Sequence, residues 1–319
     1  MNGARLSAPR PARALAAALL ALALLSACGG SGREASGTPS RTGTPLASAS
    51  SRSPDPTASA SASTSASPPA APPAAPTATP RRVRAAVYFL HDGRLSAAPR
   101  TVSGPATAAA ALRALLAGPN GAEHGHDRTT AIPSGTALRS LAVRDRVATV
   151  DLSGRYDDSA AAGTSVPARL AQVVFTATGF PGVEKVRFRV DGRPPAAALG
   201  TAAGGRPLGR ADFEDLSPAV LVESPLLGDT VTAPLRVHGT ANTFEAEFRL
   251  RLSDGSGRTL ADVRVAATSG SGTRGTFDVT VPYRAADGRP GPGTLTAYVL
   301  SAEDGHRVVV DSVPLTLTG

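Results

Sequence analysis

The chain has 319 residues, enough for two ordinary domains, and Cys28 is its only cysteine, which excludes an intramolecular disulfide. The formal net charge of +8 is concentrated near the start: residues 1–27 hold three arginines and no acid, and residues 28–84 hold six arginines and two acids. About +1 remains for the rest of the chain, which lacks the clustered basic face that nucleic-acid binding requires.

Residues 1–27 have the layout of an export signal. Arginines precede the run Ala14–Leu25, which contains only Ala and Leu and is too short for a membrane-spanning helix of about 20 residues. The run leads into Leu25-Ser26-Ala27-Cys28, which resembles a bacterial lipobox. We therefore expect cleavage between Ala27 and Cys28 and attachment of a diacylglyceryl group to the Cys28 thiol. The mature protein would then be anchored by lipid to the extracytoplasmic face of the cell membrane, exposed to the cell wall.

Residues 28–84 are rich in Ser, Thr, Pro, Ala and Gly and contain almost no large apolar side chain. Such a segment cannot bury enough surface to offset its ordering entropy, so we predict a disordered tether that holds the folded part away from the membrane. O-glycosylated stalks have the same composition, and glycosylation stays open. Heavy use of Ala, Arg, Gly and Pro is typical of a GC-rich genome, and an actinobacterium is the expected source.

Residues 85–198 alternate strand and helix patterns. His91-Asp92-Gly93-Arg94 predicts a hairpin turn, and Gly118-Pro119 predicts the end of a helix. A second helix is expected to start after Ser165 and to end at Gly179 in the left-handed conformation. The expected order is ββαββαβ, with strands near 83–90, 95–102, 138–143, 147–152 and 183–190 and helices near 108–116 and 166–178. This order predicts one α+β layer of sheet and helices.

Residues 199–219 are Gly-, Ala- and Arg-rich with little apolar periodicity, which indicates a connector. In residues 220–319 the helical pattern disappears and short stretches of strand-like alternation follow one another, separated by Asp-Gly and Gly-rich turns: 235–237, 248–252, 263–265, 277–281, 295–299, 308–310 and 313–317. Several short strands with regular turns and no helix predict an all-β antiparallel sandwich.

These segments resemble two known domains. Residues 85–198 are similar to the GerMN domain of sporulation and germination proteins in the stretches Val87–Leu90, Ala114–Pro119, Ile132–Thr136, Val147–Ser153, Leu170–Val174 and Val186–Gly192. Residues 220–317 resemble the Gmad-type immunoglobulin-like domain of bacterial spore germination in the stretches Glu223–Pro225, Gly239–Ala246 and Thr276–Val279. That family often has a Trp before the last stretch, where this chain has Arg274-Gly275. The resemblance implies an envelope lipoprotein of interaction type, without catalytic residues.

Other residue patterns favour ordinary structural roles over chemistry. His124-Gly125-His126-Asp127 could offer metal ligands but lies in a Gly-rich loop, and Thr268–Gly275 could present amides to an anion but lacks a following helix. The adjacent acids Asp157 and Asp158 are usually just solvated, and the strand-end acids Asp151 and Asp191 fit turns. Arg249 and Arg251 alternate with apolar residues and mark the polar face of a strand. We expect no catalytic, cofactor or metal site.

The sequence therefore predicts a non-catalytic, lipid-anchored envelope protein that binds a protein or cell-wall partner, in sporulation, germination or envelope signalling. The partners expected are the membrane, through Cys28, and an envelope protein or peptidoglycan, with no role for nucleic acid. A glycan-binding module is the first alternative, although exposed aromatic residues usually form such sites and the chain has no Trp and four Tyr. An accessory to a cell-wall hydrolase is the second.

Overall fold

The computed structural model describes residues 82–104, 107–158, 165–196, 199, 205–284 and 290–318. The predicted signal, Cys28 and the tether up to residue 81 lie outside the described residues. Strand β1 begins at Arg82, three residues before the expected domain boundary at Ala85. Both folded domains belong to one compact unit, residues 73–319.

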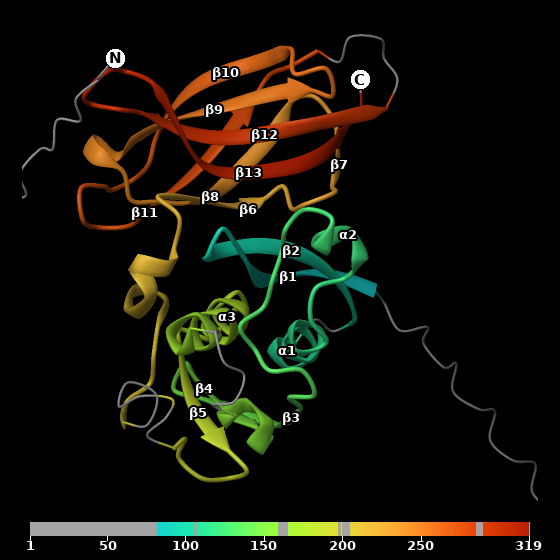
Figure 1. Ribbon diagram of the computed structural model, residues 1–319, viewed down its shortest axis with the longest axis vertical. Helices are drawn as coiled ribbons and strands as arrows, with labels where there is room; N and C mark the ends of the chain where they lie inside the picture. Colours follow the sequence, from blue (N-terminus) through green and yellow to red (C-terminus); the bar gives the residue numbers. More distant parts are fainter. Residues whose placement is uncertain are drawn as a thin grey trace, which may run out of the picture. The chain divides into compact units, whose positions relative to one another are not determined.

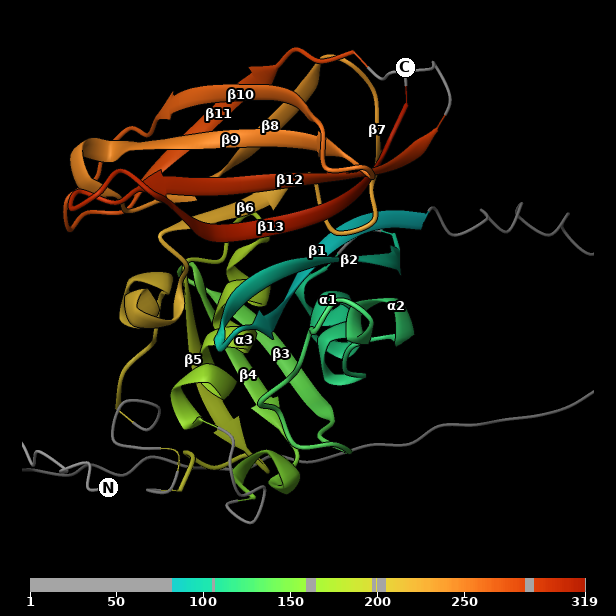
Figure 2. The same cartoon turned by 45° about the horizontal axis from the view of Figure 1, so that its top comes forward.

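The first domain has the predicted order ββαββαβ, with a short extra helix. Its elements are β1 (Arg82–His91), β2 (Arg94–Ser103), α1 (Ala108–Leu116), α2 (Gly121–His124), β3 (Leu138–Arg144), β4 (Val147–Leu152), the 3-10 turn η1 (Gly154–Asp157), α3 (Val166–Thr178) and β5 (Lys185–Val190). The strands form two separate sheets, the antiparallel hairpin β1–β2 and the sheet β3–β4–β5, in which β4 and β5 are parallel. Helices α1 and α3 pack between the two sheets (Figures 1 and 2). The domain is thus layered as hairpin, helices and sheet, where a single sheet layer was expected.

Local signals in the sequence explain most of the turns. Asp92 and Gly93 both have positive φ (50° and 75°), the conformation of a two-residue hairpin turn. Gly118 (φ 82°) ends the first helix as predicted. The prediction for Gly179 is wrong, because its φ is −71° and Gly182 takes the left-handed conformation instead. The chain continues for one more turn after α3 before it reverses direction.

Helix α3 is buried on nearly all sides, because the hairpin covers one face and the three-stranded sheet the other. Its polar side chains are therefore enclosed and hydrogen bonded to backbone. Gln172 Nε2 donates to Tyr88 O at 3.0 Å, and Tyr88 N donates to Thr176 Oγ1 at 3.1 Å. Arg169 Nε donates to the carbonyl of Ala131 at 3.2 Å. The first two bonds tie the helix to the outer edge of β1 and the third ties it to the loop at Ala131, and all three satisfy groups that burial would otherwise leave unpaired.

The second domain is the predicted sandwich, with more strands than expected, and its strand pairs are antiparallel except for the parallel pair of β7 and β13. Its elements are β6 (Val220–Ser224), β7 (Thr230–Val231), β8 (Leu235–Ala241), the turn η4 (Phe244–Ala246), β9 (Glu247–Asp254), β10 (Thr259–Ala266), β11 (Gly275–Val281), β12 (Gly291–Leu300) and β13 (Arg307–Leu317). One sheet has the order β10-β9-β12-β13-β7 and the other β11-β8-β6. The two stretches expected near 308–310 and 313–317 are one strand, which carries a bulge opposite Ala297 and Tyr298. The predicted connector contains the 3-10 helix η3 (Arg210–Leu216).

Candidate functional site: the cleft between the two folded domains

Strand β6 belongs to both hydrophobic cores. Val220 and Val222 pack into the core of the sandwich, whereas Leu221, which points to the opposite face of the strand, packs into the core of the first domain. Leu226, after the strand, also joins the first core. Strand β2 of the hairpin packs against β6. The two domains therefore meet across a buried apolar interface and do not depend on the connector alone.

Arg210 in η3 is bonded to both domains. Its Nη1 donates to Glu223 Oε1 of β6 at 2.7 Å, and its Nε and Nη2 donate to Thr178 Oγ1 at 2.9 Å and to the carbonyl of Phe175 at 3.3 Å, both at the end of α3. The guanidinium carbon lies 4.8 Å from the ring centre of Phe175 and 5.4 Å from that of Tyr88. The Tyr88 hydroxyl donates to the same Glu223 oxygen. We call Arg210, Tyr88 and Glu223 the interdomain clamp.

Burial sets the protonation of the interdomain clamp. Enclosure of the Tyr88 hydroxyl raises its pKa, and the neighbouring Glu223 carboxylate raises it further, so the hydroxyl remains a donor. Burial alone would lower the pKa of Arg210, but Tyr88 and Glu223 outweigh burial and raise it. The clamp therefore holds one positive and one negative charge in a largely desolvated place, where hydrogen bonds to charged groups are strong.

Polar contacts at β13 join the two sandwich sheets through Asp311 and join the two domains through Arg128. The carboxylate of Asp311 accepts hydrogen bonds from Val222 N of β6 at 2.9 Å and from Ser312 N at 2.8 Å. Arg128, which follows α2 and is almost fully buried, donates from Nη2 to the carbonyl of Ser312 at 3.3 Å. Burial raises the pKa of Asp311 to about 6, although the two amide bonds and the charge of Arg128 act in the opposite direction. Asp311 thus closes the gap between the edges of the two sandwich sheets.

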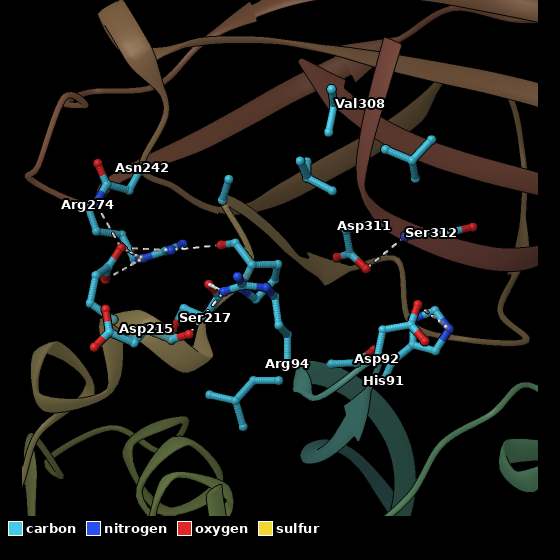
Figure 3. A pocket seen from close by; sticks show the side chains of 17 residues that line it. His91, Asp92, Arg94, Asp215, Ser217, Asn242, Arg274, Val308, Asp311 and Ser312 are labelled. Carbon is cyan, nitrogen blue, oxygen red and sulfur yellow. Dashed lines mark hydrogen bonds and ion pairs between the residues drawn. The ribbon is translucent and has the colours of Figure 1, made fainter. Parts of the chain in front are cut away.

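A cleft of about 670 Å³ opens beside these contacts (Figure 3). Its walls come from three parts of the chain that are distant in sequence: the turn and start of the hairpin (His91, Asp92, Arg94, Leu95 and Ser96), the end of η3 and the residues after it (Glu214, Asp215, Ser217, Pro218 and Ala219), and the sandwich (Asn242, Arg274 and Val308–Ser312). The cleft therefore exists only when both domains are in place.

The wall formed by η3 is fixed by Arg274. Its Nε and Nη2 donate to the two oxygens of Glu214, both at 2.9 Å, and Nη2 also donates to the carbonyl of Pro218 at 2.7 Å. Asn242 Nδ2 donates to Glu214 at 2.8 Å, and the hydrogen bond from Arg274 lowers the pKa of Glu214. On the hairpin side, Arg94 Nη1 donates to the carbonyl of Asp215 at 3.0 Å. Arg274, which lies where the family often has a Trp, therefore contributes to the junction between the domains.

The candidates considered from sequence have structural roles and do not converge on the cleft. Asp151 accepts from Gly192 N at 3.0 Å, Asp191 pairs with Arg139, and Asp157 accepts from Ala196 N at 3.0 Å. No group of three or more metal-ligating side chains occurs within the described ranges, and Thr268–Gly275 forms a hairpin loop. Arg249 does more than face solvent, since its Nε donates to Asp262 at 2.9 Å and Asp262 also accepts from the Tyr298 hydroxyl.

Sequence reasoning missed the residues that build the junction, which are Tyr88, Arg128, Arg210 and Glu223, and it missed Asp311, which joins the two sandwich sheets beside it. Tyr88 and Glu223 lie inside stretches that carry the family resemblance, so a polar residue within an otherwise apolar strand was the available signal. Arg210 had no such signal, because it lies in a segment without periodicity. Its partners are distant in sequence, and no local pattern identifies them.

The predicted anchor at Cys28, with the cleavage position at Ala27, lies outside the described residues. In the part of the chain that the structure covers, no helix has the length and apolar character needed to cross a membrane.

Comparison with solved structures finds 12 similar chains, three of which are described here. The tandem GerMN domains of the sporulation protein GerM from Bacillus subtilis match with 16% identity and a TM-score of 0.33, over 65% of this chain and 64% of that one. The first GerMN domain of that protein matches with 19% identity and a TM-score of 0.28, over 40% and 95%. A candidate lipoprotein from Clostridium perfringens matches with 20% identity and a TM-score of 0.28, over 43% and 93%. The present chain thus spans just under two thirds of the tandem protein.

Comparison with family descriptions gives a direct assignment of both domains. No curated protein matches the chain. Residues 86–196 match the Germane family, described as sporulation and spore germination, and residues 219–306 match Gmad2, described as the immunoglobulin-like domain of bacterial spore germination. The chain therefore carries a Germane domain of the sporulation and spore germination type, followed by a Gmad2 immunoglobulin-like domain.

Proposed function

We propose that this protein is a non-catalytic docking protein of the cell envelope, held to the membrane by lipid on Cys28, whose two domains together present a binding cleft to a protein partner. The observation that carries the proposal is the junction between the domains. Strand β6 is shared by both cores, and the interdomain clamp adds charged hydrogen bonds across the same junction. An interface of this kind fixes the walls of the cleft relative to each other.

The polar groups of the cleft support docking over catalysis. The Glu214 carboxylate is bound by Arg274 and Asn242, and Asp311 is bound by two backbone amides. A nucleophile would need a general base within hydrogen-bond reach and a third group to orient that base. Glu214, Arg274 and Asp311 instead hold the walls of the cleft.

A protein partner is favoured over a glycan by the position of the aromatic residues. Glycan sites usually present aromatic rings to solvent, yet Tyr88, Tyr156, Tyr283 and Tyr298, the four tyrosines of the chain, are all buried. Phe244, at 80% exposure, is the aromatic side chain that the described residues leave open to solvent. It lies in the sandwich and outside the cleft lining.

The lipid anchor is tested by mass spectrometry of the protein purified from native membranes, with Cys28→Ser as the paired variant. We expect the wild type to begin at an acylated Cys28 and to incorporate labelled palmitate, and the variant to do neither. A mature form that begins elsewhere, or an unmodified Cys28, would remove the anchor from the proposal. Docking is tested in the same membranes by cross-linking. If the protein is recovered cross-linked to cell-wall fragments and to no other protein, the glycan alternative is favoured.

A further inference from the structure

Part of strand β13 has a free backbone edge. On one side β13 pairs with β12 along its length, but on the other side β7 pairs with it only at Thr316 and Leu317. The carbonyls of Pro314 and Ser312 are covered by Gly228 N at 2.8 Å and by Arg128 at 3.3 Å. Among the described strands, none pairs with the outer side of β13 from Arg307 to Val310.

The alternation of an antiparallel ladder identifies the free groups. His306 O accepts from Ser301 N at 2.9 Å, so those two residues form a bonded position next to the hairpin loop. Alternation then turns the N–H and C=O of Arg307 and Val309 away from β12, since they lie opposite Leu300 and Tyr298 at the non-bonded positions. An unpaired row of this kind is a template for another strand.

The outer edges of β1 and β10 are covered or protected. The outer edge of β1 is bonded at Tyr88 by α3 and at Leu90 by Thr129, whose amide and carbonyl both pair with it at 2.9 Å. Strand β10, at the far edge of the same sandwich sheet, carries Asp262 and Arg264, and charged side chains discourage strand addition. The open stretch of β13 begins with Arg307, whose guanidinium carbon lies 5.2 Å from the ring centre of Tyr298 in the neighbouring strand. It continues with three consecutive valines, of which Val308 and Val309 are 38% and 60% exposed.

The cleft runs along this edge. Side chains of consecutive strand residues point to opposite faces, so a pocket lined by one face would include every second residue. The cleft is lined by all five residues from Val308 to Ser312, which means that it borders the edge of the strand (Figure 3). The opposite wall contains Arg94, Leu95 and Ser96 of β2, also consecutive, and no further described strand pairs with the outer side of β2.

The charge of the walls indicates the kind of segment that would fit. Four carboxylates (Asp92, Glu214, Asp215 and Asp311) and two guanidinium groups (Arg94 and Arg274) line the cleft. Arg274 and Glu214 neutralise each other through their ion pair at 2.9 Å. Asp92 and Asp215 are exposed, so they are available to a basic side chain that enters the cleft.

We propose that the cleft binds an extended segment of a partner protein by strand addition to Arg307–Val310, and that this segment alternates apolar residues with basic ones. The inference rests on the proposed docking function and names the site and the chemistry of the partner. Main-chain hydrogen bonds to the free edge would supply affinity, and the exposed valines and carboxylates would select the side chains.

The test uses the full-length protein in detergent and three acetylated, amidated seven-residue peptides. The first alternates Val and Arg, the second alternates Val and Glu, and the third is the Val/Arg peptide with a central Pro that cannot complete the backbone ladder. We expect the Val/Arg peptide to bind and to slow amide exchange at residues 307–312. The other two should bind at least about tenfold more weakly, a difference of about one hydrogen-bonded or charged contact.

Two pairs of variants separate the edge from the charge. Val309→Pro removes the outward N–H without removing a bond to β12, and Val309→Thr keeps it, so only the first should weaken binding about tenfold. Asp92→Asn removes a carboxylate of the cleft, while Asp145→Asn changes the matching turn residue of β3–β4, which has nearly the same φ (49° against 50°) and lies outside the cleft. Only Asp92→Asn should weaken binding of the Val/Arg peptide. Should Val309→Pro fail to fold, Val309→Lys, which keeps the N–H and adds a repelling charge, replaces it.

Equal binding of the three peptides, no binding of any of them, or binding that Val309→Pro leaves unchanged would overturn the inference. A concentration-dependent dimer that Val309→Pro dissolves would also overturn it, since the edge would then serve a second copy of this chain. The proposed function fails separately: if membrane cross-linking captures the same partner with wild type and Val309→Pro, docking stands and this site does not. If the wild type cross-links to no protein, the docking function itself is refuted.

Discussion

Replacement of Arg210 by Ala removes the cation of the interdomain clamp and is the most direct test of how the two domains are held together. The change deletes the hydrogen bonds from Arg210 to Glu223, Thr178 and the carbonyl of Phe175. It also leaves the Glu223 carboxylate, which is 17% exposed, with the Tyr88 hydroxyl as its remaining partner in the clamp. We therefore expect a loss larger than that of a surface ion pair.

The magnitude follows from the burial of the pair. Removing one partner of a fully buried ion pair costs about 3–5 kcal/mol, but the Arg210 side chain is 28% exposed, so water compensates for part of this. The stacking of the guanidinium over two rings adds about 0.5–1 kcal/mol at a partly exposed site. We expect Arg210→Ala to lower the free energy of unfolding by about 2–4 kcal/mol, or the Tm by about 4–16 °C at 2–4 °C per kcal/mol.

The assay is thermal and urea unfolding of the folded part, followed by calorimetry and by amide exchange in β1 and β6. Arg210→Lys keeps the charge and loses the planar fork, so it should fall between wild type and Ala. Arg236→Ala is the matched control, because Arg236 pairs with Asp278 across neighbouring strands of the sandwich but both side chains are largely exposed. The control should unfold almost as the wild type does.

A second expectation distinguishes a junction from a local contact. If the clamp couples the domains, Arg210→Ala should broaden the single calorimetric transition or split it into two, because the charged hydrogen bonds that join β6 to the end of α3 are then lost. The reasoning is refuted if Arg210→Ala and Arg236→Ala have the same small effect. It is also refuted if Arg210→Ala destabilises the protein while exchange in β1 and β6 stays as in the wild type.

Two further variants test how strand β6 is held within the sandwich. Because burial raises the pKa of Asp311 to about 6 in the folded state, above the ordinary value of an aspartate (about 4), the contribution of Asp311 to stability falls as the pH rises from about 4 to 6, by up to about 3 kcal/mol. Asp311→Asn keeps an acceptor for Val222 N and should flatten that part of the pH profile of unfolding; parallel wild-type and variant profiles would contradict this. Gly239→Ala places a Cβ 2.1 Å from Leu221 O and should cost at least about 1–3 kcal/mol, whereas Gly291→Ala, with open space around it, should cost little in the same urea titration.

The order of elements could be predicted because it depends on neighbours in sequence. The turn at Asp92-Gly93 and the helix end at Gly118 need a particular φ, and the residue types that allow it are visible in the chain. The Asp-Gly turns and alternating stretches of the sandwich have the same local origin. The prediction for Gly179 was wrong because a glycine after a helix permits the left-handed conformation without requiring it. Gly182, three residues later, adopts that conformation instead.

The junction could not be predicted because its determinants are pairs of residues far apart in the chain. Glu223 is a charged residue near the end of a largely apolar strand. Its role is visible only from its contacts with Arg210 and Tyr88. Periodicity also fails for α3, whose polar residues face buried backbone where an amphipathic pattern predicts solvent. Strand β6 escaped the prediction for a related reason: it is short and buried on both faces, so it shows no alternation of apolar and polar residues.

The sharing of β6 between two cores has a consequence for the order in which the protein acquires its structure. Because the chain is synthesised from its N-terminus, the whole Germane match is made before Leu221 and Leu226, which complete that domain's core, are available. The first domain therefore reaches its final packing only after the leading strand of the second domain has been made. For the same reason the two domains are not independent folding units. A genetic fusion that separates them at the connector divides one hydrophobic core between two polypeptides.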